Sequence, residues 1–297
     1  MKKFLRQTLI VFAPLILGLV LVEGYNRIVE NEYSYKDQWV KEHAKEIRWV
    51  ALGNSHAYYG IEPSKMEAGG FNLALPGQSV YLDYLLFEHY NPVLENLETI
   101  VVNVSYASFY RNHGVAKWRR PYYYHKMGID SDSMGFYSVS KLCMSCGLGF
   151  KPAVKPVLQK LKGKSNVLCN EDGSFKKKKQ ESGNLEGEGN LERHLSESGK
   201  GSNQRAIYQM LSELALESGV QIIFVKLPKS QSYLEGLPEE KVRAMDNFIS
   251  DLVSSNSGFS YLNACDSLGL DDSHFSDIDH MNSKGAEVFS TWLDAYL

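Results

Sequence analysis

Short apolar runs alternate with amphipathic segments along most of this 297-residue chain. Five runs have the composition of buried strands: IRWVAL (47–52), GFNLALPG (70–77), ETIVVNVSYAS (98–108), VQIIFVKLP (220–228) and FSYLNAC (259–265). Four segments with a helical pattern lie between or after them: 79–97, 204–219, 237–255 and 283–297. Strands joined through helices run parallel and are covered on both faces. The alternation therefore predicts a three-layer α/β/α, flavodoxin-like domain with a mostly parallel sheet.

The amino terminus has the charge pattern of a membrane anchor. Lys2, Lys3 and Arg6 precede TLIVFAPLILGLVLV, an uncharged run of 15 residues at 8–22. Basic residues before an apolar run hold the chain start in the cytoplasm and send the remainder of the chain across the membrane. The run and its flanks come close to the ~20 residues of a spanning helix. Since the next residues, VEGYNRIVENEY, offer no small-x-small cleavage site, we predict one uncleaved transmembrane signal anchor over 1–25.

Composition divides the rest of the chain. Residues 26–47 are polar and are predicted to form a tether, and residues 48–297 are predicted to form one domain. Within it, 163–203 is rich in Gly, Ser, Glu and Lys and almost free of large apolar residues, so we expect a flexible, solvated insertion there. This arrangement predicts a single-pass membrane protein with its domain on the extracytoplasmic side, which in a bacterial cell is the periplasmic side of the inner membrane.

Charge and cysteine content narrow the classes of function. A net charge of -3 and a pI near 6.3 give no reason to propose nucleic acid as a partner. Cys143 and Cys146 form a C-x-x-C, and Cys169 and Cys265 stand apart. Neither the strand context of a redox motif nor the second cysteine pair of a zinc site accompanies them. Outside the cytoplasm one or two disulfides are expected, with buried free thiols as the equal alternative.

Polar residues gather where ligands bind in parallel sheets, beyond the carboxyl ends of the strands. Gly53-Asn54-Ser55 follows the first strand, and Gly77 follows the second. The loop after the last strand reads DDSHFSDIDHMNSKGAEVF and contains Asp277 and His280, three residues apart. A serine is a weak nucleophile that needs an adjacent histidine, itself oriented by a carboxylate. The predicted topology brings these three residue types to one edge of the sheet.

These two blocks resemble those of the SGNH (GDSL-type) hydrolases. Gly53-Asn54-Ser55 resembles their first block, with Asn where those enzymes usually have Asp. The segment DIDHMNSKGAEVF resembles their last block, D-x-x-H, with Asp277 and His280 in the two key places. The continuation His-Met-Asn-x-x-Gly-Ala is similar to a membrane-anchored branch that includes proteins of alginate O-acetylation and of lipoteichoic-acid D-alanylation. The resemblance covers both ends of the region 48–297.

The resemblance implies roles for individual residues. Ser55 would be the nucleophile, His280 the base and Asp277 its orienting partner, with the N–H groups of Ser55 and Gly77 as oxyanion donors. The family also has an asparagine after the third strand as a third donor. Here that region reads VVNVSYASFY, with only Ser105 or Ser108 near the expected place.

Several neighbouring residues have more than one interpretation. Asn54, His56 and Asn103 are candidate substrate-binding residues, although His56 could equally be a helix-start residue. Asp279 competes with Asp277 as the partner of the histidine. The dense acid and imidazole cluster of this loop could also bind a divalent metal. A solvated acidic loop is the preferred interpretation, so we predict no metal and no cofactor.

The resemblance implies a serine esterase or O-acyltransferase that acts on acyl groups of a cell-envelope polysaccharide or polymer through a Ser55 acyl-enzyme. Its partners would be that polymer, the membrane and a membrane acyl-transfer protein. The alternative is a non-catalytic polymer-binding or assembly protein that retains the fold.

Overall fold

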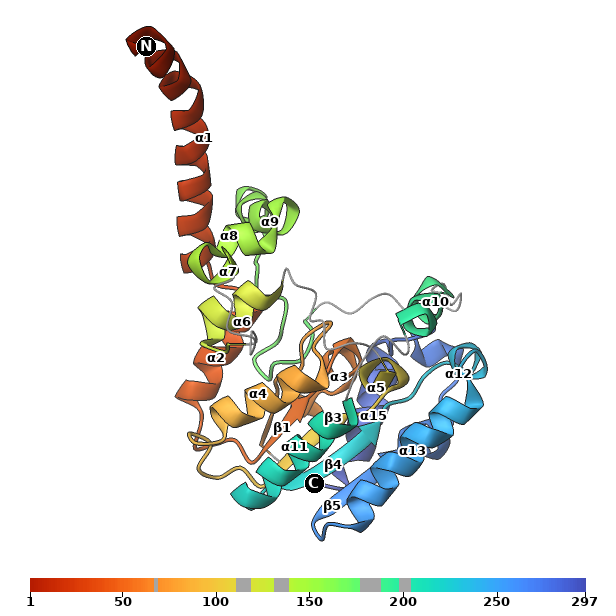
Figure 1. Cartoon of the computed structure of the whole chain (residues 1–297). Helices are drawn as coiled ribbons and strands as arrows, with labels where there is room; N and C mark the ends of the chain where they lie inside the picture. The colour runs from red at the N-terminus through yellow and green to blue at the C-terminus, as the bar shows by residue number, and fades with distance from the viewer. Residues whose placement is uncertain (67–68, 111–118, 131–138, 177–187, 198–203) are drawn as a thin grey trace. The chain divides into compact units, whose positions relative to one another are not determined.

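The computed structural model (Figure 1) describes residues 1–66, 69–110, 119–130, 139–176, 188–197 and 204–297. The chain divides into two compact units. The first consists of Met1–Asp37 and Val115–Leu168, and the second of Gln38–Gly114 and Cys169–Leu297. The helix α2 (Glu32–Glu42) runs from the first unit into the second. Nothing in the sequence pattern indicated that residues 115–168 group with the amino terminus.

The second unit is built on a five-stranded, fully parallel sheet. Its strands are β1 (Trp49–Leu52), β2 (Gly70–Asn72), β3 (Thr99–Asn103), β4 (Gln221–Lys226) and β5 (Phe259–Asn263). They lie in the order β2-β1-β3-β4-β5, with registers such as Val50↔Ile100 and Ile100↔Ile222. This is the flavodoxin-like order, whose topological switch point lies between β1 and β3.

Helices cover both faces of this sheet, as Figure 1 shows. On one face lie α4 (Val80–Tyr90), α11 (Gln204–Ser218) and α13 (Glu239–Ser254). On the other lie α3 (Ser55–Gly60) and α15 (Ser283–Asp294). The shorter elements of this unit are η1 (Pro63–Lys65), α5 (Tyr106–Tyr110), α10 (Glu188–Glu197), α12 (Gln231–Glu235), α14 (Ala264–Ser267) and η3 (Asp272–His274). The predicted α/β/α fold class is confirmed.

The inner strands are short and almost wholly buried because both faces of the sheet are covered, whereas four of the five residues of the edge strand β5 are half-buried. Every residue of β1 and of β3 is buried. Each of the five predicted apolar runs supplies one strand, and polar or turn-forming residues such as Gly53-Asn54-Ser55, Ser105 and Pro228 follow the ends of β1, β3 and β4. These residues lie at the carboxyl edge of the sheet, where the candidate site is found.

The first unit contains α1 (Lys2–Ile28), which is long and apolar enough to cross a membrane. It also contains α6 (Arg120–Met127), α7 (Val139–Leu142), α8 (Met144–Leu148) and α9 (Phe150–Leu161). The Glu23 carboxylate accepts the backbone N–H groups of Met144 and Ser145 at 3.0 and 2.7 Å. The Cys143–Cys146 pair is a disulfide, one of the two outcomes that the sequence left open, and Cys169 and Cys265 are free.

Part of the stretch 163–203, expected to be a solvated insertion, is folded into the second unit. The backbone N–H of Phe175 donates to the carbonyl of Tyr58, and Cys169 is buried. Farther along, α10 carries a buried histidine, His194. The stretches 177–187 and 198–203 of the expected insertion lie outside the described residues. A low apolar content hid these short ordered pieces because each buries only one or two side chains.

Candidate active site

Ser55 occupies the first position of α3, directly beyond the carboxyl end of β1. Gly53 has a φ of +137°, and a Cβ atom there would lie 2.7 Å from the Cβ of Asn103, so only glycine fits. The next residue, Asn54, is the N-cap of α3, and its side-chain oxygen accepts the N–H of His56 at 2.9 Å. The chain therefore leaves the strand, turns sharply and begins a helix within three residues, which presents a half-buried Ser55 at the sheet edge.

His280 and Asp277 come from the loop between β5 and α15. The Ser55 Oγ lies 2.9 Å from the His280 Nε2. On the other side of the imidazole, Nδ1 lies 2.9 and 3.2 Å from the two Asp277 carboxylate oxygens. Asp277 Oδ1 also accepts the backbone N–H of His280 at 2.8 Å, which fixes the loop around the carboxylate. The structure thus joins the three predicted residues in one hydrogen-bonded chain.

The hydrogen-bonded series Ser55–His280–Asp277 has the geometry of a general-base system. When Nδ1–H donates to Asp277, Nε2 is left as the acceptor for the Ser55 hydroxyl. Asp277 is buried, and the His280 side chain is only 13% exposed, so little water competes for these hydrogen bonds. The proton that Nε2 takes from the Ser55 hydroxyl could later be passed to a leaving alcohol.

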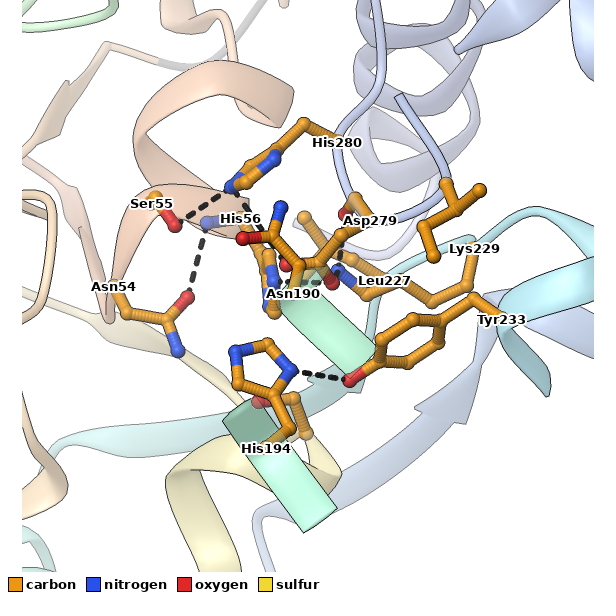
Figure 2. Close-up of polar contacts among 12 residues, drawn as sticks. Asn54, Ser55, His56, Asn190, His194, Leu227, Lys229, Tyr233, Asp279 and His280 are labelled. Carbon is orange, nitrogen blue, oxygen red and sulfur yellow. Dashed lines mark hydrogen bonds and ion pairs between the residues drawn. The ribbon is translucent and has the colours of Figure 1, made fainter. Parts of the chain in front are cut away.

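Asp279, the rival partner of His280, has its own partners (Figure 2). Its Oδ1 lies 2.8 Å from His56 Nε2 and 3.0 Å from the Lys229 ammonium. Its other oxygen, Oδ2, is 3.9 Å from His280 Nε2. Burial by itself opposes ionisation, but the neighbouring His56, which also hydrogen-bonds to the carboxylate, and the Lys229 ammonium hold the pKa of Asp279 well below its usual value. Asp279 is therefore paired with His56 and Lys229 and does not replace Asp277 as the partner of His280 Nδ1.

His56 is buried, in contrast to a residue that reaches out to a substrate. Only 4% of it is exposed. Burial, opposed by the Asp279 charge, lowers the pKa of His56 to about 4, so the ring is neutral at pH 7. A neutral ring that donates from Nε2 to Asp279 has Nδ1 as an acceptor, and no hydrogen-bond partner reaches that atom among the described residues. His56 lies beneath His280, with ring centroids 5.3 Å apart.

Asn103 lies under the Ser55 turn. Its Nδ2 donates to Asn54 Oδ1 at 3.1 Å, and 1% of the residue is exposed. The other two candidates for the region after β3, Ser105 and Ser108, bond to each other at 3.0 Å, and Ser108 also contacts Tyr208. Asn103 therefore holds the Asn54 side chain in the turn before Ser55. The predicted Ser55 and Gly77 N–H groups remain the candidate oxyanion donors.

The two predicted donor turns are linked by a buried carboxyl that the sequence did not single out. Gly77 has a φ of +75° in the turn 75–78, closed by the bond from Gln78 N–H to the Leu75 carbonyl at 3.1 Å. Asp83, in the first turn of α4, accepts the Gln78 side-chain amide at 2.6 Å and the backbone N–H of Gly53. Burial raises the pKa of Asp83 to about 7. Asp83 therefore ties the Ser55 turn to the Gly77 turn.

Aromatic residues that the sequence did not single out form walls of the site. The Tyr59 ring meets the His280 ring at a centroid distance of 5.3 Å and an angle of 89°. Phe175 packs edge-on against Tyr59 at 4.6 Å. On the other side, His194 of α10 bonds through Nδ1 to the Tyr233 hydroxyl at 2.8 Å, as Figure 2 shows. Tyr59 lies one helical turn after Ser55, and that spacing was the one signal available in the sequence.

The acid and imidazole cluster resolves into separate pairs. Asp271 binds His274 at 2.7 Å, Asp277 binds His280, and Asp279 binds His56. Among the described residues, His56, Asp279 and His280 are the group whose donor atoms lie close enough together, within 4.8 Å, to hold a metal ion. The Lys229 ammonium already neutralises Asp279 at 3.0 Å and would repel a cation there. The residues do not fit a metal, and we derive no chemistry through one.

Comparison with known proteins returned structural likenesses only. No family model matches the chain, and no curated protein sequence matches it. A candidate platelet activating factor protein from Streptococcus pneumoniae is similar at 11% identity and a TM-score of 0.44, over 97% of this chain and 98% of that one. A GDSL-like lipase from Bacteroides thetaiotaomicron is similar at 12% identity and a TM-score of 0.43, over 90% of this chain and 98% of that one. The fold assignment rests on the strand order, and the chemistry on the side-chain geometry described above.

Proposed function

We propose that this chain is a membrane-anchored serine esterase or O-acyltransferase that acts on acyl groups of a cell-envelope glycan or polymer. The observation that carries the proposal is the chain Ser55 Oγ–His280 Nε2 (2.9 Å) and His280 Nδ1–Asp277 (2.9 Å). A structural serine needs neither a half-buried imidazole beside it nor a buried carboxylate behind that imidazole.

The first step forms an acyl-enzyme. Ser55 Oγ attacks the ester carbonyl while its proton moves to His280 Nε2, and Asp277 stabilises the resulting imidazolium. The carbonyl oxygen becomes an oxyanion that the Ser55 and Gly77 N–H groups would receive. When the carbon–oxygen ester bond breaks, His280 returns the proton to the leaving alcohol. Asp279 Oδ2 lies 3.9 Å from Nε2, but its charge is already balanced by the Lys229 ammonium, so Asp277 carries the stabilisation.

The second step releases the acyl group. His280 takes a proton from water or from a sugar hydroxyl, whose oxygen attacks the acyl-enzyme, and Ser55 is regenerated with that proton. Water as the acceptor gives hydrolysis, and a sugar hydroxyl gives transfer. Support for an envelope polymer as the acceptor comes from α1, which would hold the domain at a membrane surface, and from the resemblance of the two sequence blocks.

Active-site labelling tests the proposal. The full chain in detergent is treated with a fluorophosphonate probe, and the labelled peptide is identified by mass spectrometry. We expect labelling at Ser55, lost in Ser55→Ala and reduced by about 10²–10⁴ in rate in His280→Ala, because an unassisted serine is a weak nucleophile.

A matched control is available in the same loop. His274 pairs with Asp271 at the same i,i+3 spacing but does not contact Ser55, so His274→Ala should label at the wild-type rate. A folded chain that gives no labelling at Ser55 would contradict the proposal and favour the non-catalytic, polymer-binding alternative.

A further inference from the structure

The helix α9 of the first unit exposes an apolar face. Phe150 is 83% exposed, Leu161 78% and Leu158 48%, whereas Ala153 and Pro156, on another side of the helix, are buried. At 100° per residue the three exposed residues share one stripe. A soluble surface helix buries such a stripe, so this one needs a partner outside the described chain.

Beside this stripe the charge has a single sign. Residues 150–164 read FKPAVKPVLQKLKGK, with five lysines and no acidic residue. Lys151, Lys155 and Lys162 are exposed, and helical spacing puts them along one border of the apolar stripe. An apolar stripe bordered by lysines is the composition of helices that lie in the plane of a membrane interface.

The contacts of α8 and α9 with α1 fix the position of these two helices along the axis of α1. Val22, the last residue of the apolar run, packs against the cluster of Met144, Leu148 and Ala153. One turn later, Asn26 Nδ2 donates to Ser145 Oγ at 3.0 Å and to the Ala153 carbonyl at 2.8 Å. A helical turn rises ~5.4 Å, so α9 is attached within about one turn of the end of the apolar run.

A second short helix extends the same surface. On α7, Leu142 is 69% exposed and Val139 64%. The Leu142 carbonyl accepts a hydrogen bond from Arg27 of α1 at 2.9 Å, which attaches α7 to the same end of the anchor. Figure 1 shows α7, α8 and α9 gathered around that end of α1.

We propose that α7 and α9 form a membrane-interface platform, with the apolar stripe of α9 inserted among the lipids of the leaflet where α1 emerges. The ligand is a bilayer surface that contains anionic headgroups, which the lysines of α9 contact. This inference rests on the proposed anchoring by α1 and does not depend on the esterase chemistry. Attachment at the end of the membrane-spanning run favours lipid over a protein partner, because the bilayer is already there.

The experiment uses the full chain in vesicles of equal parts phosphatidylglycerol and phosphatidylcholine. An environment-sensitive fluorophore is attached to Leu161→Cys, to Leu17→Cys within the apolar run and to Leu216→Cys on α11, an exposed leucine of the second unit. The unsubstituted chain measures background labelling of Cys169 and Cys265. Nitroxide-bearing lipids then report which positions contact the bilayer.

We expect quenching at Leu161→Cys and at Leu17→Cys, with none at Leu216→Cys. Lys155→Gln with Lys162→Gln should weaken the quenching at position 161 by roughly fivefold per lysine in partition constant in these vesicles. The double substitution should have no such effect in control vesicles of phosphatidylcholine alone. Quenching at Leu17→Cys but not at Leu161→Cys would overturn the platform and leave the anchor intact. A probe at 161 that is shielded from water but not quenched would assign the face to a protein partner, and no quenching at Leu17→Cys would overturn both.

Discussion

At the residue scale, two carboxylates of one loop have different tasks because different groups neutralise them. Asp277 faces His280 Nδ1, and Asp279 faces His56 and Lys229. The sequence spacing favoured Asp277, but it could not reveal that Asp279 is held by a lysine fifty positions earlier in the chain. Long-range ion pairs of this kind leave no local pattern, so sequence alone predicts the pair Asp277 and His280 better than the groups around it.

Replacement of Asp279 should act mainly on stability. Asp279→Asn leaves the buried Lys229 charge uncompensated, and breaking a buried pair costs about 3–5 kcal/mol. Denaturant unfolding measures this loss, and Asp279→Asn combined with Lys229→Met should recover part of it. Asp277→Asn should instead lower the Ser55 labelling rate with a smaller loss of stability. If Asp279→Asn mainly slowed labelling and Asp277→Asn mainly lowered stability, then Asp279 and not Asp277 would be the partner of His280.

Asp83 should make stability depend on pH in the direction opposite to a salt-bridged acid. Burial raises its pKa in the folded state from 3.8 to about 7, so between these values the unfolded chain loses the proton that the folded chain keeps. The contribution of Asp83 to the free energy of unfolding therefore falls as pH rises through this window. Measured at a series of pH values, the stability of wild type relative to Asp83→Asn should decline from about pH 4 to about pH 7 and then level off. If the difference in stability between wild type and Asp83→Asn did not change with pH, Asp83 would not be a buried carboxyl that stays protonated in the folded state.

At the element scale, the short helix α3 presents Ser55, the proposed nucleophile, directly beyond the end of strand β1. The five strands and the long helices were predictable, because apolar runs and helical spacing are local properties. The pieces that build the site walls were not. Phe175 and His194 lie in a polar stretch, and their burial comes from contacts with Tyr58, Tyr59 and Tyr233 that only the folded chain creates.

The cap of α3 gives a test at this scale. Asn54→Ala removes the acceptor for the His56 N–H and should cost about 1 kcal/mol of stability. Because α3 begins at Ser55, it should also slow fluorophosphonate labelling, whereas Asn54→Asp, which keeps a cap, should not. Ile249→Val in the buried face of α13 is a control of similar cost, about 0.5–1.5 kcal/mol, that should leave labelling unchanged. Equal labelling in all three variants would mean that the cap does not position Ser55.

At the scale of the whole molecule, the described site residues all belong to the second unit. Ser55 lies within residues 38–114 of that unit, and Asp277 and His280 lie within residues 169–297. The first unit has its own stabilising contacts, among them the Cys143–Cys146 disulfide. The sequence indicated the long apolar helix α1 but not the rest of this first unit, because helices α6 to α9 are short and are separated from α1 in the sequence by the first three strands.

This division predicts independence of the two units. Cys143→Ser with Cys146→Ser should loosen the first unit, measured as faster hydrogen exchange over 139–161, and should leave the Ser55 labelling rate unchanged. A large fall in labelling would show that the site depends on the first unit.

The proposed chemistry depends on an acyl-enzyme at Ser55, and trapping that intermediate is its most direct test. The full chain is mixed with p-nitrophenyl acetate, quenched in acid and digested, and the peptide that contains Ser55 is weighed. We predict that this peptide gains one acetyl group in wild type and in His274→Ala, and no acetyl group in Ser55→Ala or His280→Ala. An unmodified Ser55 peptide in a wild-type chain that still releases p-nitrophenol, or acetylation that persists in His280→Ala, would contradict the acyl-enzyme mechanism.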